Sequence, residues 1–424
     1  MGRRNHFIVH DGVHGSIRLD GPYGEILDTP EMQRMGQVHQ LGLANLVFPG
    51  ANHTRMEHMI GAFHLAGRFC SSLGITGQEA AMLRVAALVH DIGHPPFSHT
   101  FEDVLKRRLG VDHMELTARI IKGEADIVPE GEGAVLRGRP RIADCIERAG
   151  LDAGEVAELV MMEKGARGLK AYLTSLIHGP VDVDQLDYLM RDAHYTGVAQ
   201  GRIDADRIIE TSVISDGRMA VGRRGMPAVE GLTVSRVLMN SSVYFHKTVR
   251  IAELMLTKAV SMLEREQFVD VFKDTDASLS ERLKAHGGFQ RETALRLKYR
   301  RLYKSSLLLS IDGMDAEQKR RIMELSARRA LPKVEDELSA SAGAEAGSVI
   351  IDAAPIEYLA GRGRKGKTEV PILDDSGRVR KLTSLSPIAR AVQMHSSQDW
   401  GLMVACDSRI KSRVAKIAAH AIFG

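Results

Sequence analysis

The chain has 424 residues, of which 44% are hydrophobic and 26% are charged, as is usual for a globular protein. Its formal net charge of +3 is small and does not by itself indicate a nucleic-acid partner. Cys70, Cys145 and Cys406 lie far apart, which argues against a disulfide scaffold or a cysteine zinc site and predicts a reducing, cytoplasmic location. We expect neither a membrane span nor a signal peptide, because no sufficiently long apolar run is present.

Hydrophobic periodicity predicts a mainly helical fold. Helices are expected over residues 54–73, 78–91, 182–195 and 233–263, the last as one long helix or two in tandem. In the first of these, Met56, Ile60 and Phe63 recur at three- and four-residue steps. The second leaves little polar surface and should be buried, and Gly93 and Pro95 should end it. Gly-rich turns around a short helix are expected in residues 131–140 and 151–168.

The pattern changes towards the C-terminus. Residues 281–306 are predicted to be helical and strongly basic, and RLKYRRLYK (296–304) within them should be a solvated helix face. Short strands should follow in residues 347–354 and 368–379, with a turn at Asp374–Gly377. Helices are expected in residues 386–397 and 409–423, and a surface loop in residues 360–368. The predicted organisation is a helical core, a helical extension and a small α+β lobe, over residues 1–265, 266–330 and 331–424.

One stretch combines several potential metal ligands. In ALVHDIGHPPFSHTFE (87–102), His90 and Asp91 stand at the predicted helix end, about 100° apart around the helix, so both can reach one ion. Two further ligands must come from elsewhere in the chain, and His58 and Asp184 are the best candidates. His53 and His58, five residues apart and roughly 140° around a helix, are a poor pair for one ion.

Spacing alone leaves plainer interpretations open. A histidine such as His58 is more often a hydrogen-bonded core or surface residue than a ligand. Asp184, Tyr188 and Asp192 recur every four residues, which is also typical of a solvated helix face. His90 and His94 have i,i+4 spacing, but the residues between and after them interrupt a helix.

Several ordered motifs resemble one family. HTRMEH, HDIGHPPFSH and DVDQLDYLMRD match the H…HD…D signature of HD-domain phosphohydrolases. ILDTPEMQRM, VFPGANHTRMEH and YFHK resemble the branch of deoxynucleoside triphosphate triphosphohydrolases. That branch includes bacterial dGTPases and the animal enzyme that joins a sterile-alpha-motif domain to an HD domain. The resemblance runs from about Ile8 to Lys304 and is looser beyond it.

The resemblance implies hydrolysis of a deoxynucleoside triphosphate (dNTP) to deoxynucleoside and triphosphate. The implied metal ligands are His58, His90, Asp91 and Asp184. They would hold a divalent ion (Fe, Mn, Zn, Ni or Mg) that activates a water molecule, with a second Mg possible on the triphosphate. The implied catalytic residues are His99 as general acid, Glu102 as its orienting carboxylate, and His94 and His113 beside them. The family usually has Asp at position 102.

The resemblance also implies contacts to the substrate. Phosphate contacts are expected from Arg55, Tyr188 and Arg236, contacts to the 3′-hydroxyl from Gln40 and Asp192, and exclusion of a 2′-hydroxyl from Leu41 and Tyr244. Gln185 stands where better-studied members have Lys, so one phosphate-neutralising charge is missing. Likewise Phe7, His10 and Gly36 replace family residues that grip a guanine-nucleotide activator, which predicts activity without one.

Two other functions remain possible at this level. Another HD phosphohydrolase would act on nucleoside monophosphates, cyclic nucleotides or single-stranded nucleic acid ends. A non-catalytic nucleotide binder would have little use for a complete metal set. We expect a homo-oligomer, either dimer or tetramer; nucleic acid is a possible partner that nothing in the spacing specifies.

Overall fold

The computed structural model describes residues 6–129, 131–161, 171–359, 369–394 and 400–424. The chain divides into two compact units. Unit 1 comprises Met1–Met239, Val269–Leu279 and Lys365–Val392, and unit 2 comprises Asn240–Phe268, Ser280–Arg364 and Gln393–Gly424. These boundaries differ from the expected three-part division, which stays a prediction.

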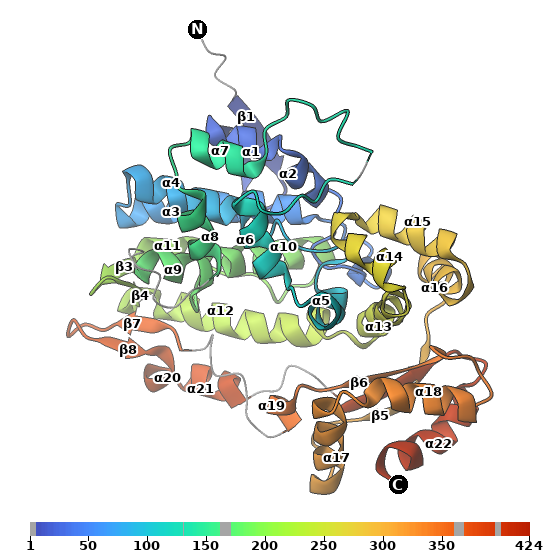
Figure 1. Cartoon of the computed structure of the whole chain (residues 1–424). Helices are drawn as coiled ribbons and strands as arrows, with labels where there is room; N and C mark the ends of the chain where they lie inside the picture. Colours follow the sequence, from blue (N-terminus) through green and yellow to red (C-terminus); the bar gives the residue numbers. More distant parts are fainter. Residues whose placement is uncertain (1–5, 130, 162–170, 360–368, 395–399) are drawn as a thin grey trace. The chain divides into compact units, whose positions relative to one another are not determined.

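Most elements are helices, as the sequence predicted (Figure 1). The elements that begin in unit 1 are β1 (His6–Asp11), β2 (Gly15–Asp20), α1 (Pro22–Leu27), α2 (Pro30–Met35), α3 (Arg55–Leu73), α4 (Gly77–Val89), α5 (Glu102–Leu109), α6 (His113–Ile121), α7 (Ile142–Arg148), α8 (Ala153–Met161), α9 (Ala171–His178), α10 (Val183–Thr196), α11 (Ala205–Thr211), β3 (Ser212–Ser215), β4 (Arg218–Gly222), α12 (Met226–Met239), α15 (Asp276–His286), β7 (Pro371–Leu373), β8 (Val379–Lys381), α20 (Leu382–Leu385) and α21 (Pro387–Met394). Those that begin in unit 2 are α13 (Lys247–Ser261), α14 (Arg265–Val269), α16 (Gly288–Lys298), β5 (Lys304–Leu309), α17 (Ala316–Ala327), α18 (Leu331–Ser341), β6 (Val349–Ala353), α19 (Ile356–Leu359), β9 (Leu402–Cys406) and α22 (Lys411–Phe423).

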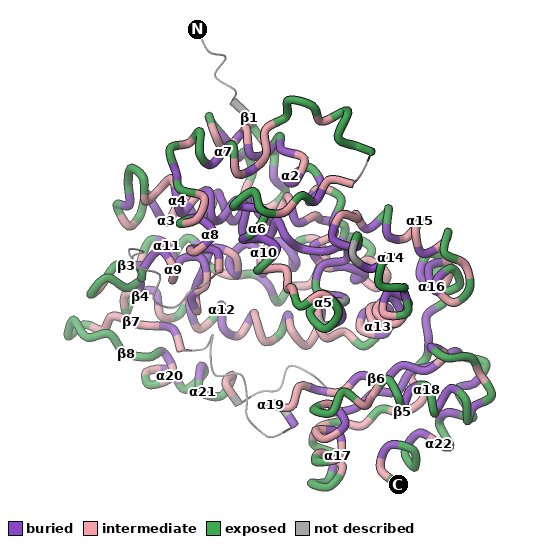
Figure 2. Tube along the Cα trace, viewed as in Figure 1, coloured by how far each residue is buried: buried purple, intermediate pink, exposed green. Residues whose placement is uncertain are grey.

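The centre of unit 1 is α3, which packs against α4 and α10. All three helices are largely buried (Figure 2). Thr54 begins α3 with a capping box, since its side chain accepts from the Glu57 amide and Glu57 accepts from the Thr54 amide. Asp182 caps α10 in a similar way. Gly61 permits the close approach, because a Cβ there would lie 1.9 Å from Asp187 Oδ1. The helices predicted over 54–73 and 182–195 are confirmed.

The turn after α4 departs from regular structure. The helix ends at Val89, two residues before the prediction, and His90 is its C-cap. Gly93 has no room for a side chain, because a Cβ would lie 2.4 Å from the Thr117 amide nitrogen. Phe97 and Ser98 both have left-handed φ angles, 56° and 57°, which are costly for residues other than glycine. A strained turn of this kind persists only where its surroundings hold it.

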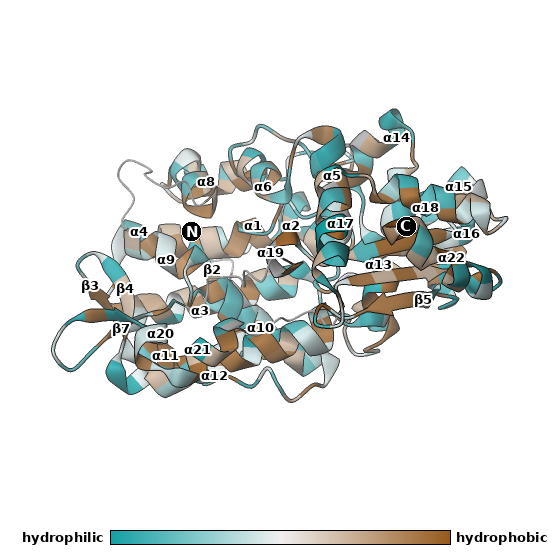
Figure 3. Ribbon diagram, turned by 90° about the horizontal axis from the view of Figure 1, so that it is seen from below, coloured by the Kyte–Doolittle hydropathy of each residue, from teal (hydrophilic) through white to brown (hydrophobic). Residues whose placement is uncertain are grey.

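Two sheets contain segments far apart in the chain. In unit 1 the strand order is β3-β4-β7-β8, with β7 parallel to β4, and the predicted turn at Asp374–Gly377 joins β7 to β8. In unit 2 the order is β5-β9-β6, both pairs antiparallel. Figure 3 shows β5 with hydrophobic colouring and α17 as mainly hydrophilic. The hairpin of β1 and β2 was not predicted.

Two expectations for the middle and the C-terminal part need correction or refinement. The region 233–263 forms two helices, α12 and α13, joined by a π-helical turn at Asn240–Tyr244, as the second alternative predicted. The basic stretch 296–304 is not one helix face: α16 ends at Lys298, Arg300 has a left-handed φ of 53°, and Lys304 begins β5. Strand pairing with β9 overrides helical propensity there.

Other predicted segments fall partly or wholly outside the described residues. The region 151–168, expected to contain Gly-rich turns near a short helix, contains α8, and its last seven residues lie outside them. The predicted loop 360–368 lies wholly outside them, as does the end of the helix predicted over 386–397. No helix in the described part of the chain is both long and apolar enough to cross a bilayer.

Candidate active site and metal centre

Three of the four predicted metal ligands converge in unit 1. His58 comes from α3, His90 from the end of α4 and Asp184 from the first turn of α10. One donor atom of each lies within 4.8 Å of the other two. His58 Nε2 is 3.1 Å from Asp184 Oδ1 and 3.3 Å from His90 Nε2, and His90 Nε2 is 3.7 Å from Asp184 Oδ1. We call these residues, with Asp91, the ligand group.

The second nitrogen of each ring explains how the ligand group fits a metal ion. His58 Nδ1 faces the Asp187 carboxylate at 2.8 Å, and His90 Nδ1 faces the Ala87 carbonyl at 2.9 Å. Both partners are acceptors, so each Nδ1 carries a proton, and each Nε2 offers a lone pair to a metal ion once it has lost any proton of its own. The two Nε2 atoms lie 3.3 Å apart, close enough for a proton or a metal ion to lie between them and the carboxylates. The donor set therefore fits a divalent ion of the kind that HD domains bind.

The electrostatics of the ligand group favour a cation. Burial by itself lowers the pKa of His58, but the carboxylates of Asp184 and Asp187 outweigh burial and raise that pKa to about 10. Burial raises the pKa of Asp184, but hydrogen bonds from His58 and His90 outweigh it and lower that pKa. The carboxylates thus stay ionised, and the field that attracts a proton to His58 also attracts a metal ion.

Asp91, the fourth predicted ligand, lies slightly apart. Its carboxylate oxygens are 3.6 Å from His58 Nε2 and from His90 Nε2. One oxygen also accepts a short hydrogen bond from Arg55, whose Nε donates to Ser98 Oγ at 2.8 Å. Arg55 is only 2% exposed, so its guanidinium holds Asp91 beside the other ligands. The predicted phosphate contact of Arg55 stays a prediction.

A second set of buried polar residues supports the ligand group through hydrogen bonds. The buried Asp187 accepts hydrogen bonds from His58, from His14 Nε2 at 2.7 Å and from Arg191 Nε at 2.8 Å. Arg191 also donates to Asp11 at 2.7 Å. Asp11 and His14 belong to the hairpin of β1 and β2, so the N-terminal hairpin helps to orient a metal ligand. This supporting layer was not predicted, although HDGVHG and the i,i+4 pair of Asp187 and Arg191 are present in the sequence.

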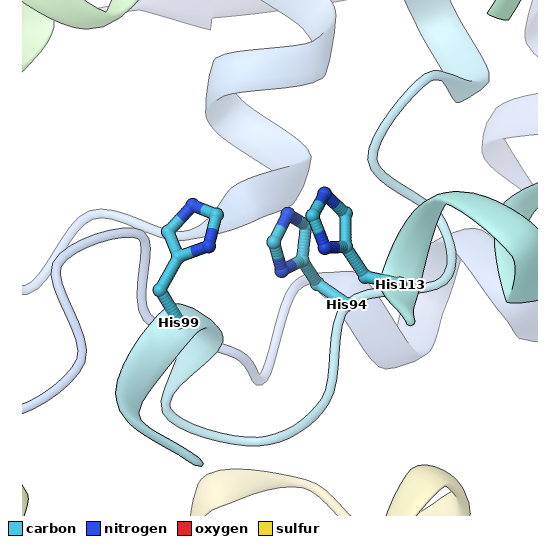
Figure 4. Close-up of side chains that lie close together, drawn as sticks. All are labelled: His94, His99 and His113. Atoms are coloured by element: carbon cyan, nitrogen blue, oxygen red, sulfur yellow. The ribbon is translucent and has the colours of Figure 1, made fainter. Parts of the chain in front are cut away.

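In a second cluster the rings of His94, His99 and His113 lie close together (Figure 4). We call these three residues, with Glu102, the acid group. Glu102 accepts from His99 Nδ1 at 2.9 Å, as predicted, and also from His113 Nδ1 in a short hydrogen bond that was not predicted. Burial raises the pKa of Glu102, but these two hydrogen bonds outweigh it and hold that pKa well below its usual range. Both rings keep Nε2 for another partner.

His94 connects the two groups. Its Nε2 lies 3.4 Å from Asp91 Oδ1, and its ring stacks on His113 with centroids 4.0 Å apart and planes 19° apart. Burial and the nearby Arg55 keep the pKa of His94 well below its usual value, so the ring is neutral. The stacked rings of His94 and His113 lie in nearly parallel planes, and the lone pairs of their nitrogens lie in those planes. The two lone pairs therefore cannot point at one common ion, so the acid group does not fit a single ion in this orientation.

The residues predicted to bind the sugar lie on a loop and on α10. Gln40 is buried, and its side-chain oxygen has no hydrogen-bond partner among the described residues. The half-buried Leu41 follows it. Asp192 is buried and accepts from His53 Nε2 at 2.8 Å, while His53 stacks on Tyr195. His53, a poor metal partner by its spacing, thus holds Asp192 instead.

The other predicted substrate contacts lie on α10, α12 and unit 2. With its amide nitrogen towards the Pro180 carbonyl, Gln185 accepts from Arg236 at 3.0 Å, so this glutamine positions Arg236. Burial lowers the pKa of Arg236, and the nearby Tyr188 opposes this effect. Tyr244 ends the π-helical turn of unit 2. The predicted substrate contacts of Tyr188, Arg236 and Tyr244 stay predictions.

Comparisons with known proteins show the family of this chain. The family model of the HD domain matches residues 55–138, and that of the HD associated region matches residues 203–424. An uncharacterized protein of Methanocaldococcus jannaschii is 30% identical over 97% of this chain and 83% of its own length. The deoxynucleoside triphosphate triphosphohydrolase SAMHD1 of Gallus gallus is 30% identical over 59% of this chain. The chain spans 44% of that relative's length.

Solved structures show the same fold. A hypothetical protein from Aquifex aeolicus has a TM-score of 0.69 at 27% identity, with 97% of this chain and 99% of that chain covered. A phosphohydrolase from Bacteroides thetaiotaomicron has a TM-score of 0.68 at 23% identity, with 96% and 100% covered, and supports the fold alone. The predicted resemblance is confirmed, and the chain belongs to the family of HD-domain phosphohydrolases, with an HD associated region after its HD domain.

Proposed function

We propose that this protein hydrolyses deoxynucleoside triphosphates to deoxynucleoside and inorganic triphosphate. The observation that carries the proposal is the convergence of His58, His90 and Asp184 in the ligand group, joined through Asp91 and His94 to the acid group. The names of relatives such as SAMHD1 add the substrate class. A cytoplasmic homo-oligomer is part of the proposal.

The ligand group provides the site for the ion. His58, His90, Asp91 and Asp184 would hold Fe, Mn, Zn, Ni or Mg, with a second Mg on the triphosphate. A divalent ion at such a site supplies an activated water and neutralises phosphate charge. The chain's own part is to fix the ligands: Asp187 and the Ala87 carbonyl orient the two rings, and Arg55 holds Asp91.

The acid group provides the proton for the leaving group. Attack at the α-phosphorus breaks its bond to the 5′-oxygen of the sugar, and that alkoxide leaves poorly without a proton. His99 is the proposed donor because its side chain is 63% exposed, whereas His94 is buried. Glu102 holds the Nδ1 of His99, which leaves Nε2 to deliver the proton. His113 shares that carboxylate and is the alternative donor.

The pocket for the sugar is proposed from two buried polar groups. The unpartnered side-chain oxygen of Gln40 and the carboxylate of Asp192 are acceptors suited to the 3′-hydroxyl. Leu41 would exclude a 2′-hydroxyl, and Tyr244, which belongs to unit 2, is proposed for the same role. Arg55, Tyr188 and Arg236 would contact phosphates, with Gln185 setting the orientation of Arg236.

The test is a product analysis with purified protein over a screen of divalent metals. Each of the four dNTPs and four NTPs is incubated in water enriched in oxygen-18. The products are then separated, and their masses are measured by mass spectrometry. Attack at the α-phosphorus yields triphosphate that carries the label and unlabelled deoxynucleoside. A variant with both His90→Ala and Asp91→Ala controls for contaminating hydrolases. Release of diphosphate or phosphate, or equal kcat/KM for dGTP and GTP, would overturn the proposal in favour of another HD phosphohydrolase.

A further inference from the structure

One short segment of the chain joins unit 1 although the sequence on both sides of it belongs to unit 2. Val269–Leu279 groups with unit 1, whereas Asn240–Phe268 before it and Ser280–Arg364 after it group with unit 2. Within this segment Asp276 begins α15, and its side chain is 5% exposed. The hydrogen bonds of Asp276 explain why the segment packs into unit 1.

The Asp276 carboxylate joins two loops of the candidate site. Oδ1 accepts from the Phe97 amide at 2.7 Å. Oδ2 accepts from the His39 amide at 3.0 Å and from His39 Nδ1 at 2.5 Å. Phe97 lies in the strained turn between His94 and His99 of the acid group (Figure 4), and the chain after His39 continues into the loop predicted to bind the sugar. One carboxylate thus contacts both parts of the site.

Further contacts bring the same two loops together. Ser98 Oγ donates to the His39 carbonyl at 2.6 Å and accepts from Arg55 Nε. Gly42 has a φ of +51°, and a Cβ there would lie 2.8 Å from the Phe97 carbonyl oxygen. The loops therefore meet too closely for a side chain at that point, and their separation depends on the groups that hold them.

A buried arginine fixes the other end of the turn. Arg34 of α2 donates to the His94 carbonyl at 2.9 Å and to the Asp274 carbonyl at 3.0 Å. The Asp276 amide also donates to the Gln37 carbonyl at 3.3 Å. The segment around residues 274–276 is thus bound to α2, to the residues after it and to the turn, all within unit 1.

We propose that Asp276 is a positioning residue, which holds the strained Phe97–Ser98 turn against the His39 loop and so sets the place of His99. This inference rests on the proposed function only for its catalytic consequence. Phe97 keeps its left-handed conformation because its amide has a charged, buried acceptor. Without that acceptor the turn relaxes, and His99, two residues further on, moves from the leaving group.

The variant Asp276→Asn tests the proposal with little change in volume. Its amide presents one acceptor oxygen where the wild-type carboxylate serves three donors, so one loop must lose its contact. We expect kcat to fall by roughly 10–100-fold, since misplacement of a catalytic group by about 1 Å costs on the order of a hundredfold. Metal content should stay unchanged. Asp270→Asn is the matched control, because it removes a charge from the same segment but affects only the exposed ion pair with Lys273.

A double-mutant cycle separates positioning from a general structural role. If Asp276 acts through His99, Asp276→Asn should lower kcat by less than about threefold in a His99→Ala background. An equal fall in both backgrounds would overturn the proposal. If Asp276→Asn fails to fold, Asp276→Glu, which keeps the charge but moves the carboxylate by one methylene, enters the same cycle.

A readout independent of activity separates this inference from the proposed function. Hydrogen exchange of peptides covering residues 92–101 and 37–43 should be faster in Asp276→Asn than in wild type and in Asp270→Asn. Unchanged exchange in both peptides would overturn the proposal. Faster exchange together with a wild-type protein that hydrolyses no dNTP would support the holding role and overturn the proposed function instead.

Discussion

The ligand group and the acid group both consist of histidines and carboxylates, yet they are held in different ways. In the ligand group each ring has its own acceptor: His58 binds Asp187, and His90 binds a backbone carbonyl of its own helix. In the acid group two rings share a single carboxylate, Glu102, and His99 is mostly exposed. The first group is therefore rigid, and the second depends on the turn that carries it.

The difference has a physical reason. Metal ligands must keep their places, so they come from the ends of packed helices and have buried supporting partners. The proposed general acid must reach the leaving group of a substrate that enters from solvent, and the His99 side chain is 63% exposed. The turn between His94 and His99 then needs outside support, and Asp276 and Arg34 provide it. Four experiments test this comparison.

The largest effect should come from the ligand group. Replacing both His90 and Asp91 by alanine removes two metal ligands, so bound metal and hydrolysis should both be lost. The fall in metal affinity should exceed the roughly 10–100-fold that loss of a supporting hydrogen bond costs. Metal content by elemental analysis and turnover are measured together. His10→Ala, at an exposed position, is the control for removal of a histidine. Full activity at unchanged metal content in the double variant would reject the ligand group.

Substitutions in the acid group should lower turnover and leave the metal content unchanged. His99→Ala should keep the metal and lower kcat by a factor of roughly 10²–10⁴, the usual contribution of a general acid. His113→Ala is measured beside it, because both rings share Glu102. A loss below about fivefold for His99→Ala, with a larger loss for His113→Ala, would move the acid role to His113.

The supporting layer should have an intermediate effect on metal binding. Asp187→Asn weakens the acceptor that orients His58, so metal affinity should fall by roughly 10–100-fold, the usual cost of losing such a partner. Competition with a chelator of known affinity measures the change. His14→Gln removes one donor to Asp187 and should cause a smaller loss. Unchanged affinity in both variants would mean that the ligand group needs no support from the hairpin.

The smallest expected effect concerns pH. The hydrogen bond to Asp276 raises the pKa of His39 above its ordinary 6.5, with burial opposing and Glu57 adding to the shift. Because the folded pKa is raised, the stabilisation is complete below pH 6.5 and is lost as pH rises through the folded pKa. The Tm difference between wild type and His39→Gln should thus be on the order of 1–2 °C at about pH 6 and shrink at higher pH. A difference that stays constant up to pH 9 would contradict the ion pair.

The sequence by itself determined the helices that carry the ligand group, and its resemblance to HD-domain phosphohydrolases implied the members of that group. Hydrophobic periodicity is a local signal, so α3 and α10 were predicted nearly to the residue, and the structure adds the caps at Thr54 and Asp182. His90 and Asp91 stood beside Gly93, which marked the end of α4. These features depend on neighbours within one or two helical turns, which a sequence displays directly.

Only the tertiary structure decided which partners hold those residues. His14 and Asp187 are 173 residues apart, Phe97 and Asp276 are 179 apart, and His39 and Asp276 are 237 apart. The pairing of β5 with β9, which includes the last three residues of the helical region predicted over 281–306, is likewise long-range. Contacts of this kind leave no periodic trace in the chain, because side chains far apart in sequence become partners only when packing of the core fixes their directions.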